Sequence, residues 1–245
     1  MRDYNQVNIE RYEKDDFSGK GIEKNIYSSI NPVGNYGLYK IQQISRKFIR
    51  DLRRKTKKEY DKIHILDCGC GTGLWTRTMA NYCGTPENIY GFEYSQNRLD
   101  YCKKMNPAIN YRLGNIVGGV YDEYDFLFDG IISIDVLSQL RKENDIFSAL
   151  SNINKKLSPN GLFLWYEINA KTHHANFDAD SQGFSENEMD KYAETCEMKL
   201  VEKTRIFGQI KCMGKSFSTY YNVDDNHKRI TLMELVDPFL CRFNQ

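Results

Sequence analysis

The stretch ILDCGCGTGLWT, residues 65–76, decides the fold class of this chain. An apolar run ends at Asp67, glycines follow at alternate positions (Gly69, Gly71 and Gly73), and a helical pattern begins directly after them. A strand, a tight turn and a helix in this order form the first βα unit of an α/β sheet, where ligands bind at the carboxyl ends of strands. Glycine permits the positive φ angles of such a turn and lets the backbone approach a ligand closely. The sequence therefore predicts an α/β domain with a ligand site at this turn.

Strand and helix patterns alternate on the carboxyl side of the turn. Apolar runs rich in β-branched and aromatic residues predict strands at 62–67, 88–93, 127–134, 161–168, 200–207 and 217–223. Near-continuous apolar strands separated by helices are typical of a parallel sheet that is covered on both faces. We therefore expect an α/β fold with a doubly wound, mostly parallel seven-stranded sheet, helices on both faces and an N-terminal helical arm or lid.

The chain is expected to have three parts. These are an N-terminal arm or lid over residues 1–37, a ligand-binding domain over 38–223 and a C-terminal tail over 224–245. Residues 38–58 have apolar side chains at helical spacing and a basic opposite face, which is either a solvated surface or a docking surface for an acidic partner. Further along, the pattern S-x-x-E from Ser185 to Glu188 predicts the capped start of a helix.

Composition narrows the class of protein. The 245 residues carry 34 Lys and Arg against 33 Asp and Glu, a formal net charge of +1, whereas proteins that coat nucleic acid are usually more basic. Hydrophobic residues make up 40%, which excludes wholesale disorder. No apolar run is long enough to span a bilayer, the N-terminus does not resemble a signal peptide, and seven Cys stand at irregular spacing. We expect a reduced, cytoplasmic protein.

The glycine turn does not fit a phosphate ligand well. A dinucleotide site has the pattern G-x-G-x-x-G, but position 74, where the third glycine belongs, is Leu74. A phosphate-binding P-loop ends in Gly-Lys-Ser/Thr, and no Lys follows Gly73. The carboxylate of Asp67 would repel a phosphate and attract a cation. A ligand with a cationic group therefore fits this turn better than a nucleotide phosphate.

The pattern D-x-G-x-G-x-G at 67–73 resembles motif I of the class I S-adenosyl-L-methionine (SAM) dependent methyltransferases. Four further landmarks of that family are matched in the family's order: Glu93 after the second strand, Gly114–Asn115–Ile116, FDGIISIDVLSQL (128–140) and LSPNGLFLWYE (157–167). The resemblance covers roughly residues 60–170. It implies a SAM-binding methyltransferase domain, SAM as cofactor and S-adenosylhomocysteine (SAH) as product.

The resemblance also implies which residues bind SAM. Asp67 would hold the ammonium group, Glu93 the ribose hydroxyls and Asn115 the adenine amino group. The full set of expected cofactor-binding residues is Asp67, Gly69, Cys70, Gly71, Gly73, Trp75, Glu93, Tyr94, Asn115, Ile116 and Ile134. No metal is expected, because the pair Cys68 and Cys70 has no further Cys or His partners at metal-binding spacing.

The acceptor side of the site is expected above the carboxyl ends of the first, fourth and fifth strands. His173 and His174 lie in a polar loop after the fifth strand, where a neutral imidazole could act as general base, although two exposed loop histidines would look the same. Asp135 after the fourth strand is a catalytic candidate or lines the cofactor pocket. Gln139 and Glu167 are other polar groups near this edge.

Motifs of other acceptor classes are absent. Methyltransferases of adenine N6 and of glutamine carry N/D-P-P-Y after the fourth strand, and this chain has Ser133–Ile134–Asp135–Val136 there. Many small-molecule members have a His pair where this chain has Ser138–Gln139. The expected function is methyl transfer to a hydroxyl or amine of a small molecule, with a sugar or capsule-type precursor as one candidate. The alternatives are an RNA or protein methyltransferase that docks through the basic helix 46–58, and a non-catalytic SAM-binding regulatory subunit. No membrane partner is expected, and the oligomeric state is open.

Overall fold

The computed structural model describes residues 10, 12–14, 32–140, 142–167 and 183–203. The chain divides into two units, one made of residues 1–17 and 45–201 and the other of residues 18–44 and 202–245. The sheet and the described candidate site residues all belong to the first unit. The three parts expected from the sequence remain a prediction.

Five parallel strands form the sheet, in the order β3-β2-β1-β4-β5. They are β1 (Ile65–Cys68), β2 (Ile89–Glu93), β3 (Asn110–Leu113), β4 (Phe128–Ile134) and β5 (Leu157–Tyr166). Every residue of the central strands β1 and β4 is buried, as expected when helices cover both faces. The parallel α/β sheet is confirmed, but the described residues contain five strands and not the predicted seven. Leu200–Lys203, the described start of a predicted late strand, form no strand, and the rest of 200–223 lies outside the described residues.

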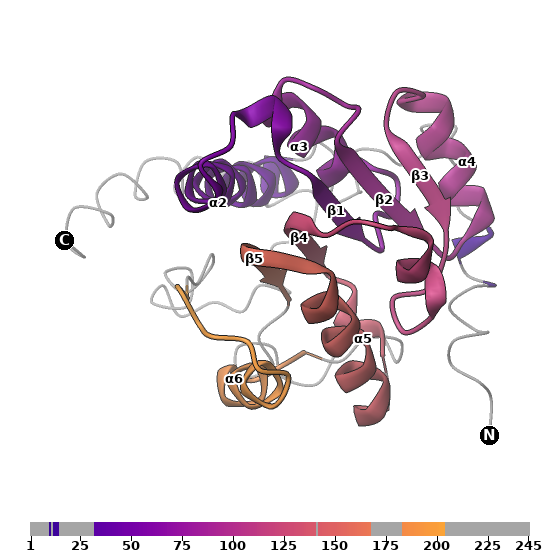
Figure 1. The fold of residues 1–245 in the computed structure, drawn as a ribbon. Coiled ribbons are helices and arrows are strands. Elements are labelled where there is room, and N and C mark those ends of the chain that lie inside the picture. Colours follow the sequence, from indigo (N-terminus) through magenta and orange to yellow (C-terminus); the bar gives the residue numbers. More distant parts are fainter. Residues whose placement is uncertain (1–9, 11, 15–31, 141, 168–182, 204–245) are drawn as a thin grey trace. The chain divides into compact units, whose positions relative to one another are not determined.

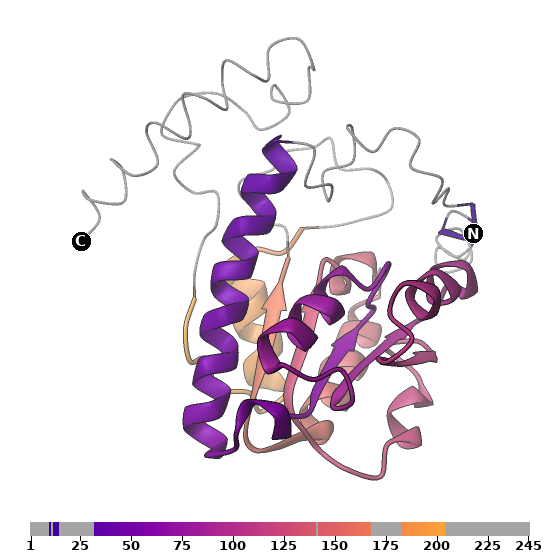
Figure 2. The same ribbon diagram turned by 90° about the horizontal axis from the view of Figure 1, so that it is seen from above.

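Helices cover both faces of this sheet. They are α3 (Leu74–Cys83), α4 (Gln96–Met105), α5 (Glu143–Lys156) and α6 (Glu186–Thr195), with short 3₁₀ helices at Tyr60–Lys62, Gly119–Glu123 and Leu137–Gln139. Figure 1 shows α3 and α4 on one face and α5 and α6 on the other. Figure 2, seen from above, shows α3 and α4 lying across the strands. The helix α6 begins with the predicted capping box of Ser185 and Glu188.

The strand order places a topological switch point at the carboxyl edge of the sheet, the position where α/β sheets generally form a ligand crevice. From β1 the chain proceeds outward to β2 and β3, and it then returns to place β4 and β5 on the other side of β1. The loops after β1 and β4 therefore diverge toward opposite faces, which is the topological switch point where α/β sheets bind ligands. The glycine turn follows β1 and Asp135 follows β4, so both lie at this switch point.

The start of β5 differs from the sequence prediction. The strand was predicted to begin at residue 161, yet β5 already begins at Leu157. The first part of β5 is irregular. Asn160 has a φ angle of 70°, and the pairing of β5 with β4 shifts register between Phe128 and Gly130. A Cβ at Gly161 would lie 3.0 Å from the carbonyl oxygen of Asp129, so the two strands approach closely there.

The helix α2 runs over Pro32–Thr56, so it begins and ends earlier than the predicted 38–58. Its second half packs on β4 through buried Phe48 and Leu52. A Cβ at Gly130 of β4 would lie 2.6 Å from Leu52 Cδ1, and no side chain fits there. The glycine in this strand therefore permits the close approach of helix and sheet.

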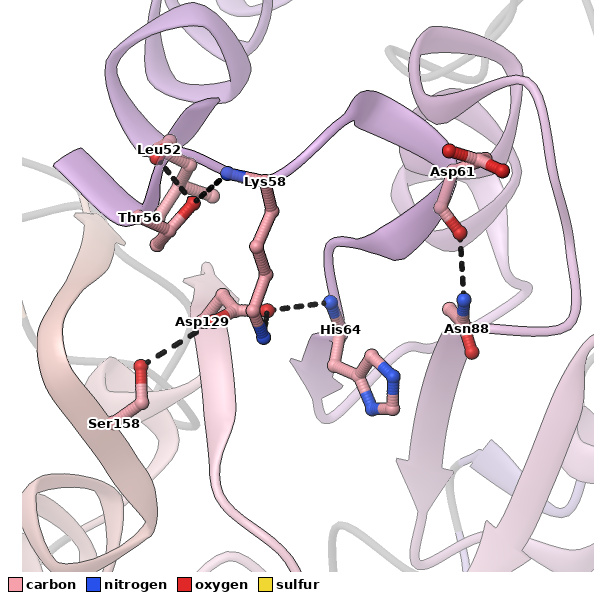
Figure 3. Close-up of polar contacts among 8 residues, drawn as sticks. All are labelled: Leu52, Thr56, Lys58, Asp61, His64, Asn88, Asp129 and Ser158. Carbon is pink, nitrogen blue, oxygen red and sulfur yellow. Dashed lines mark hydrogen bonds and ion pairs between the residues drawn. The ribbon is translucent and has the colours of Figure 1, made fainter. Parts of the chain in front are cut away.

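A buried carboxylate at the amino edge of the sheet is compensated within the protein (Figure 3). Asp129 at the start of β4 is 2% exposed, and its Oδ2 lies 2.8 Å from Lys58 Nζ. The same oxygen accepts a hydrogen bond of 2.9 Å from the backbone N–H of His64, and Ser158 Oγ lies 3.4 Å from Oδ1. A buried acid with a cationic partner and further donors has a structural role.

Candidate functional site

The glycine turn after β1 has a backbone that only glycine adopts easily. Gly69, Gly71 and Gly73 have φ angles of 72°, 56° and 76°. A Cβ at Gly69 would lie 2.7 Å from Val136 Cγ1, and one at Gly73 would lie 2.7 Å from the hydroxyl oxygen of Tyr111. The turn is therefore held close to the loop after β4, and its backbone is the surface available to a ligand.

Asp67 lies beneath this turn as a buried acid, and none of the residues that the structure describes forms an ion pair with it. It is 2% exposed, and its Oδ2 accepts a hydrogen bond of 2.6 Å from Thr76 Oγ1 in the first turn of α3. Burial raises the pKa of Asp67 to about 7, repulsion by Glu93 adds to the rise, and the hydroxyl of Thr76 opposes it. A cation placed beside Asp67 would lower this pKa again. Thr76 was not identified from the sequence as a partner of Asp67. A hydroxyl residue in the first helical turn after the glycines could have indicated it.

Glu93 at the end of β2 ties the glycine turn to the start of α4. Its Oε2 accepts a hydrogen bond of 2.9 Å from the N–H of Gly71. Its Oε1 accepts hydrogen bonds of 3.0 Å from the N–H groups of Tyr94 and Ser95. Burial raises the pKa of Glu93, while these backbone donors and the charge of Arg98 lower it. The carboxylate keeps lone pairs for further donors at this edge.

Cys70 and Trp75 occupy packed positions around the turn. Cys70 is 6% exposed, and its sulfur would lie 3.2 Å from a Cβ at Gly91. Its neighbour Cys102 and its burial raise the pKa of the Cys70 thiol well above its usual value. Trp75 is 7% exposed within α3. In the described part of the chain, no three His, Cys, Asp or Glu side chains gather as a metal site would require.

Asn115 and Ile116 follow β3 and have different environments. Asn115 is exposed, and its Oδ1 accepts a hydrogen bond of 3.0 Å from the N–H of Val117, which stabilises the turn. This oxygen has a second lone pair for a ligand donor. Ile116 is 5% exposed and belongs to the hydrophobic core. Asn115 is therefore accessible to a ligand, and Ile116 is mainly a packing residue.

Two acids stand side by side where β4 and β5 end. Ile134, 8% exposed, is the last residue of β4, and Asp135 follows it with φ 56°. Glu167 follows β5, and its Oε1 accepts hydrogen bonds from the N–H groups of Val136 (3.1 Å) and Leu137 (2.7 Å). Burial, together with the charge of Asp135, raises the pKa of Glu167 to about 8. The sequence signal for this pair was an acid directly after each of two neighbouring strands.

A short N-terminal segment lies against the same edge. The Tyr12 ring packs edge-on against Tyr94, with ring centres 5.8 Å apart, and the guanidinium carbon of Arg98 lies 3.6 Å from the Tyr12 ring centre. Tyr12 also donates a hydrogen bond of 3.4 Å to Gln139 Oε1, beyond the end of β4. Tyr12 therefore bridges the loop after β2 and the loop after β4. His173 and His174 lie outside the described residues, so their role as base stays a prediction.

The acids at this edge differ from Asp129 at the opposite edge. Asp129 has Lys58 as its partner, whereas no Lys or Arg of the described residues forms an ion pair with Asp67, Glu93 or Glu167. Buried acids normally have such partners, because an isolated buried charge is costly. The carboxyl edge therefore suits a ligand with cationic and hydroxyl groups, and it disfavours phosphate.

A family model described as a methyltransferase domain matches residues 65–161. Residues 65–161 therefore resemble the domain of the SAM-dependent methyltransferases. The matched range begins at β1 and includes the glycine turn, Glu93 and Asp135. The donor set agrees with this domain, because SAM brings an ammonium group, a sulfonium group and ribose hydroxyls but no phosphate.

Relatives of this methyltransferase domain include quinone-pathway enzymes. The ubiquinone biosynthesis O-methyltransferase of Rickettsia akari (strain Hartford) is 28% identical over 154 residues, which is 60% of this chain and 58% of that protein. The demethylmenaquinone methyltransferase of Staphylococcus aureus (strain JH9) is 26% identical over 149 residues, 60% of this chain and 57% of its own length. The match thus spans less than two thirds of these relatives.

Solved structures share the fold of the methyltransferase domain. Magnesium protoporphyrin IX methyltransferase from Synechocystis PCC 6803, determined with bound SAM, has a TM-score of 0.58 at 14% identity and covers 84% of this chain and 93% of that one. A SAM-dependent methyltransferase from Clostridium acetobutylicum ATCC 824 has a TM-score of 0.52 at 14% identity and covers 64% and 80%. At this level of identity the likeness concerns the fold alone.

Proposed function

We propose that this protein transfers a methyl group from SAM to a hydroxyl or amine of a small molecule. The observation that carries the proposal is the buried carboxylate of Asp67, which lies beneath a turn of three left-handed glycines and has no cationic partner among the described residues. An ammonium group of a ligand would supply the missing cation. SAM supplies an electrophilic methyl group, and the protein's part is to bind, orient and exclude water.

The roles of the individual residues follow from their positions. Asp67 would hold the ammonium group, and the backbone at Gly69 and Gly71 would lie against the methionine part. Glu93, already fixed by three backbone donors, would accept hydrogen bonds from the ribose hydroxyls. Tyr12 would close over the cofactor, because it already bridges the loops on both sides of the switch point.

The acceptor is proposed to be a small molecule. The names of the sequence relatives suggest quinone precursors, and a sugar or capsule-type precursor remains a second candidate. A small acceptor is favoured over RNA because the basic helix α2 is partly neutralised: Lys47 and Arg54 pair with Asp51, and Arg53 pairs with Glu59. Among the described helices, none has the length and apolar character needed to cross a membrane.

Calorimetric titration with SAM and SAH, with NAD as a control ligand, tests the cofactor. We expect micromolar binding of SAM and SAH and no binding of NAD. Binding of NAD without SAM would refute the proposal. A screen with tritium-labelled SAM against paired hydroxyl and amine acceptors then tests transfer. SAM binding without transfer to any acceptor pool, RNA and protein included, would instead favour a regulatory subunit.

A further inference from the structure

The acid pair of Asp135 and Glu167 has no assigned role in binding the ammonium or ribose groups of SAM. The two residues follow neighbouring parallel strands, so both lie at the carboxyl edge. Glu167 uses only Oε1 for the backbone N–H groups of Val136 and Leu137. Its Oε2 is buried and has no hydrogen-bond partner among the described residues. A buried carboxyl oxygen of this kind indicates that a ligand completes the site.

The acid pair lies on the side of the switch point opposite the residues that are proposed to bind the ammonium and ribose groups. Asp67 and Glu93 lie at the carboxyl ends of β1 and β2, on one side of the switch point, and would take the ammonium and ribose groups. The acid pair lies after β4 and β5, on the other side. Val136, which separates Asp135 from the Glu167-bound N–H of Leu137, packs on Gly69 of the turn. The pair is therefore coupled to the cofactor turn through a direct contact.

The surroundings of Glu167 contain no compensating cation among the described residues. The charge of Asp135 raises the pKa of Glu167, and hydrogen bonds from Ser138 and Leu137 lower it. Other titratable groups described at this edge are Asp67, Glu93, Cys70, Arg98 and Tyr12. Of these, Arg98 is cationic and lies on the side of β2, and Gln139 is an uncharged polar group at the same edge. A positive charge that approaches this edge on the side of β4 and β5 would therefore be attracted to the pair.

We infer that the Asp135–Glu167 pair is the counter-charge for the sulfonium of SAM and makes the site prefer SAM to its product. The inference rests on the proposed function. SAM and SAH share the ammonium, carboxylate and adenosine groups, but only SAM carries the sulfonium charge. The pair would thus strengthen binding of SAM and not of SAH, which helps the product to leave after methyl transfer.

Calorimetric dissociation constants for SAM and SAH test this inference in wild type and in Glu167→Gln. The amide of Gln keeps an oxygen for the N–H groups of Val136 and Leu137 but cannot ionise. The ratio of the SAH constant to the SAM constant should rise with pH in wild type relative to the variant. By about pH 9 the ratio in wild type should be about tenfold higher than the ratio in Glu167→Gln, as expected if the sulfonium lowers the pKa of Glu167 by about one unit.

Two features of the ratio isolate the acid pair. The effect of Asp67 on the ammonium group and the titration of the free ligands are the same in wild type and in Glu167→Gln. Both therefore cancel when the ratios of the two proteins are compared. Glu87→Gln, an exposed acid before β2, is the matched control and should follow wild type. If Glu167→Gln does not fold, Asp135→Asn replaces it, because Asn tolerates positive φ. Removal of the Asp135 charge should lower the SAM preference and shift its rise to lower pH.

The outcomes separate this inference from the proposed function. If wild type binds both ligands and Glu167→Gln shows the wild-type ratio at every pH, the inference is wrong and the proposed function stands. The inference is equally overturned, together with the proposed function, if wild type binds neither SAM nor SAH. A ratio that loses its excess rise with pH in Glu167→Gln but not in Glu87→Gln supports it.

Discussion

Asp67 is a buried acid whose protonation controls what it can bind. Its folded pKa of about 7 means that a proton must leave before the carboxylate can hold an ammonium group. SAH affinity, which reports on the shared ammonium group without the sulfonium charge, should therefore increase as pH rises toward about 7, by up to about tenfold per pH unit well below that value, and then level off. Titration calorimetry between about pH 5 and about pH 8 measures this dependence.

The variant Asp67→Asn provides the control for this prediction. It keeps the shape of the side chain and an oxygen for Thr76, but it lacks the titrating charge. SAM and SAH should both bind about 10- to 100-fold more weakly, as expected for loss of a charged hydrogen bond. The rise in affinity near neutral pH should largely disappear. Unchanged affinity in Asp67→Asn would place the ammonium group elsewhere.

Gly69 tests whether the backbone of the turn carries ligand binding. Gly69→Ala places a methyl group 2.7 Å from Val136 Cγ1 on a residue with φ 72°, so the turn or the loop after β4 must shift. We expect SAM affinity to fall at least about tenfold, a cost of about 1.4 kcal/mol, which is modest for a strained φ angle. The matched change Gly118→Ala meets no atom closer than 3.7 Å and should leave affinity unchanged. Equal affinities in the two variants would contradict a backbone role.

At the scale of elements, the start of α6 depends on a local signal that was visible in the sequence. The Ser185 Oγ accepts a hydrogen bond from the N–H of Glu188, and Glu188 Oε2 accepts one of 2.7 Å from the N–H of Ser185. The helix also packs on α5, where the rings of Phe147 and Tyr192 have centres 5.1 Å apart. The capping box therefore contributes to the stability of the sheet face that α5 and α6 cover.

The change Ser185→Ala should lower the free energy of unfolding by about 1 kcal/mol, because one orphan N–H of the first turn loses its acceptor. Thermal unfolding followed by circular dichroism measures the shift. Ser148→Ala, on the exposed face of α5, is the control and should not lower stability, because Ala favours a helix interior. A loss of stability in the control equal to that in Ser185→Ala would exclude a capping effect.

At the scale of the whole sheet, the two edges use buried acids in opposite ways. Asp129 at the amino edge is compensated by Lys58 and the backbone N–H of His64 (Figure 3), so it joins α2, β4 and β5. The acids at the carboxyl edge receive backbone and hydroxyl donors instead. Stability is thus expected to depend on the amino edge, and ligand affinity on the carboxyl edge.

Lys58→Met tests this separation. It leaves the buried carboxylate of Asp129 without its cation and should lower the free energy of unfolding by about 2 kcal/mol, less than a fully buried pair because Lys58 is half exposed. SAM affinity should not change. Lys62→Met, which removes an exposed pair with Asp61, should cost less than about 0.5 kcal/mol. Chemical denaturation and calorimetry of the same samples would refute the separation if Lys58→Met mainly weakened SAM binding.

Local sequence patterns were sufficient where one segment determines its own structure. The alternate glycines and the capping box at Ser185 appear in the structure as predicted, and the strand before the glycines, predicted over 62–67, is formed by Ile65–Cys68. Sequence patterns gave the wrong strand boundary where pairing with a neighbouring strand sets it. The strand was predicted to begin at residue 161, yet pairing with β4 extends β5 back to Leu157.

The sequence by itself determined the α/β class, the parallel order of strands and helices, and the glycine turn with Asp67, because propensity, periodicity and turn chemistry act over a few residues. Only the tertiary structure decided which distant groups share an environment. It places Val136 against Gly69, Tyr12 between the loops after β2 and β4, and Glu167 beside Asp135. Burial and the charge of a neighbour set the pKa of a carboxyl group, and both arise from contacts between segments that lie far apart along the chain.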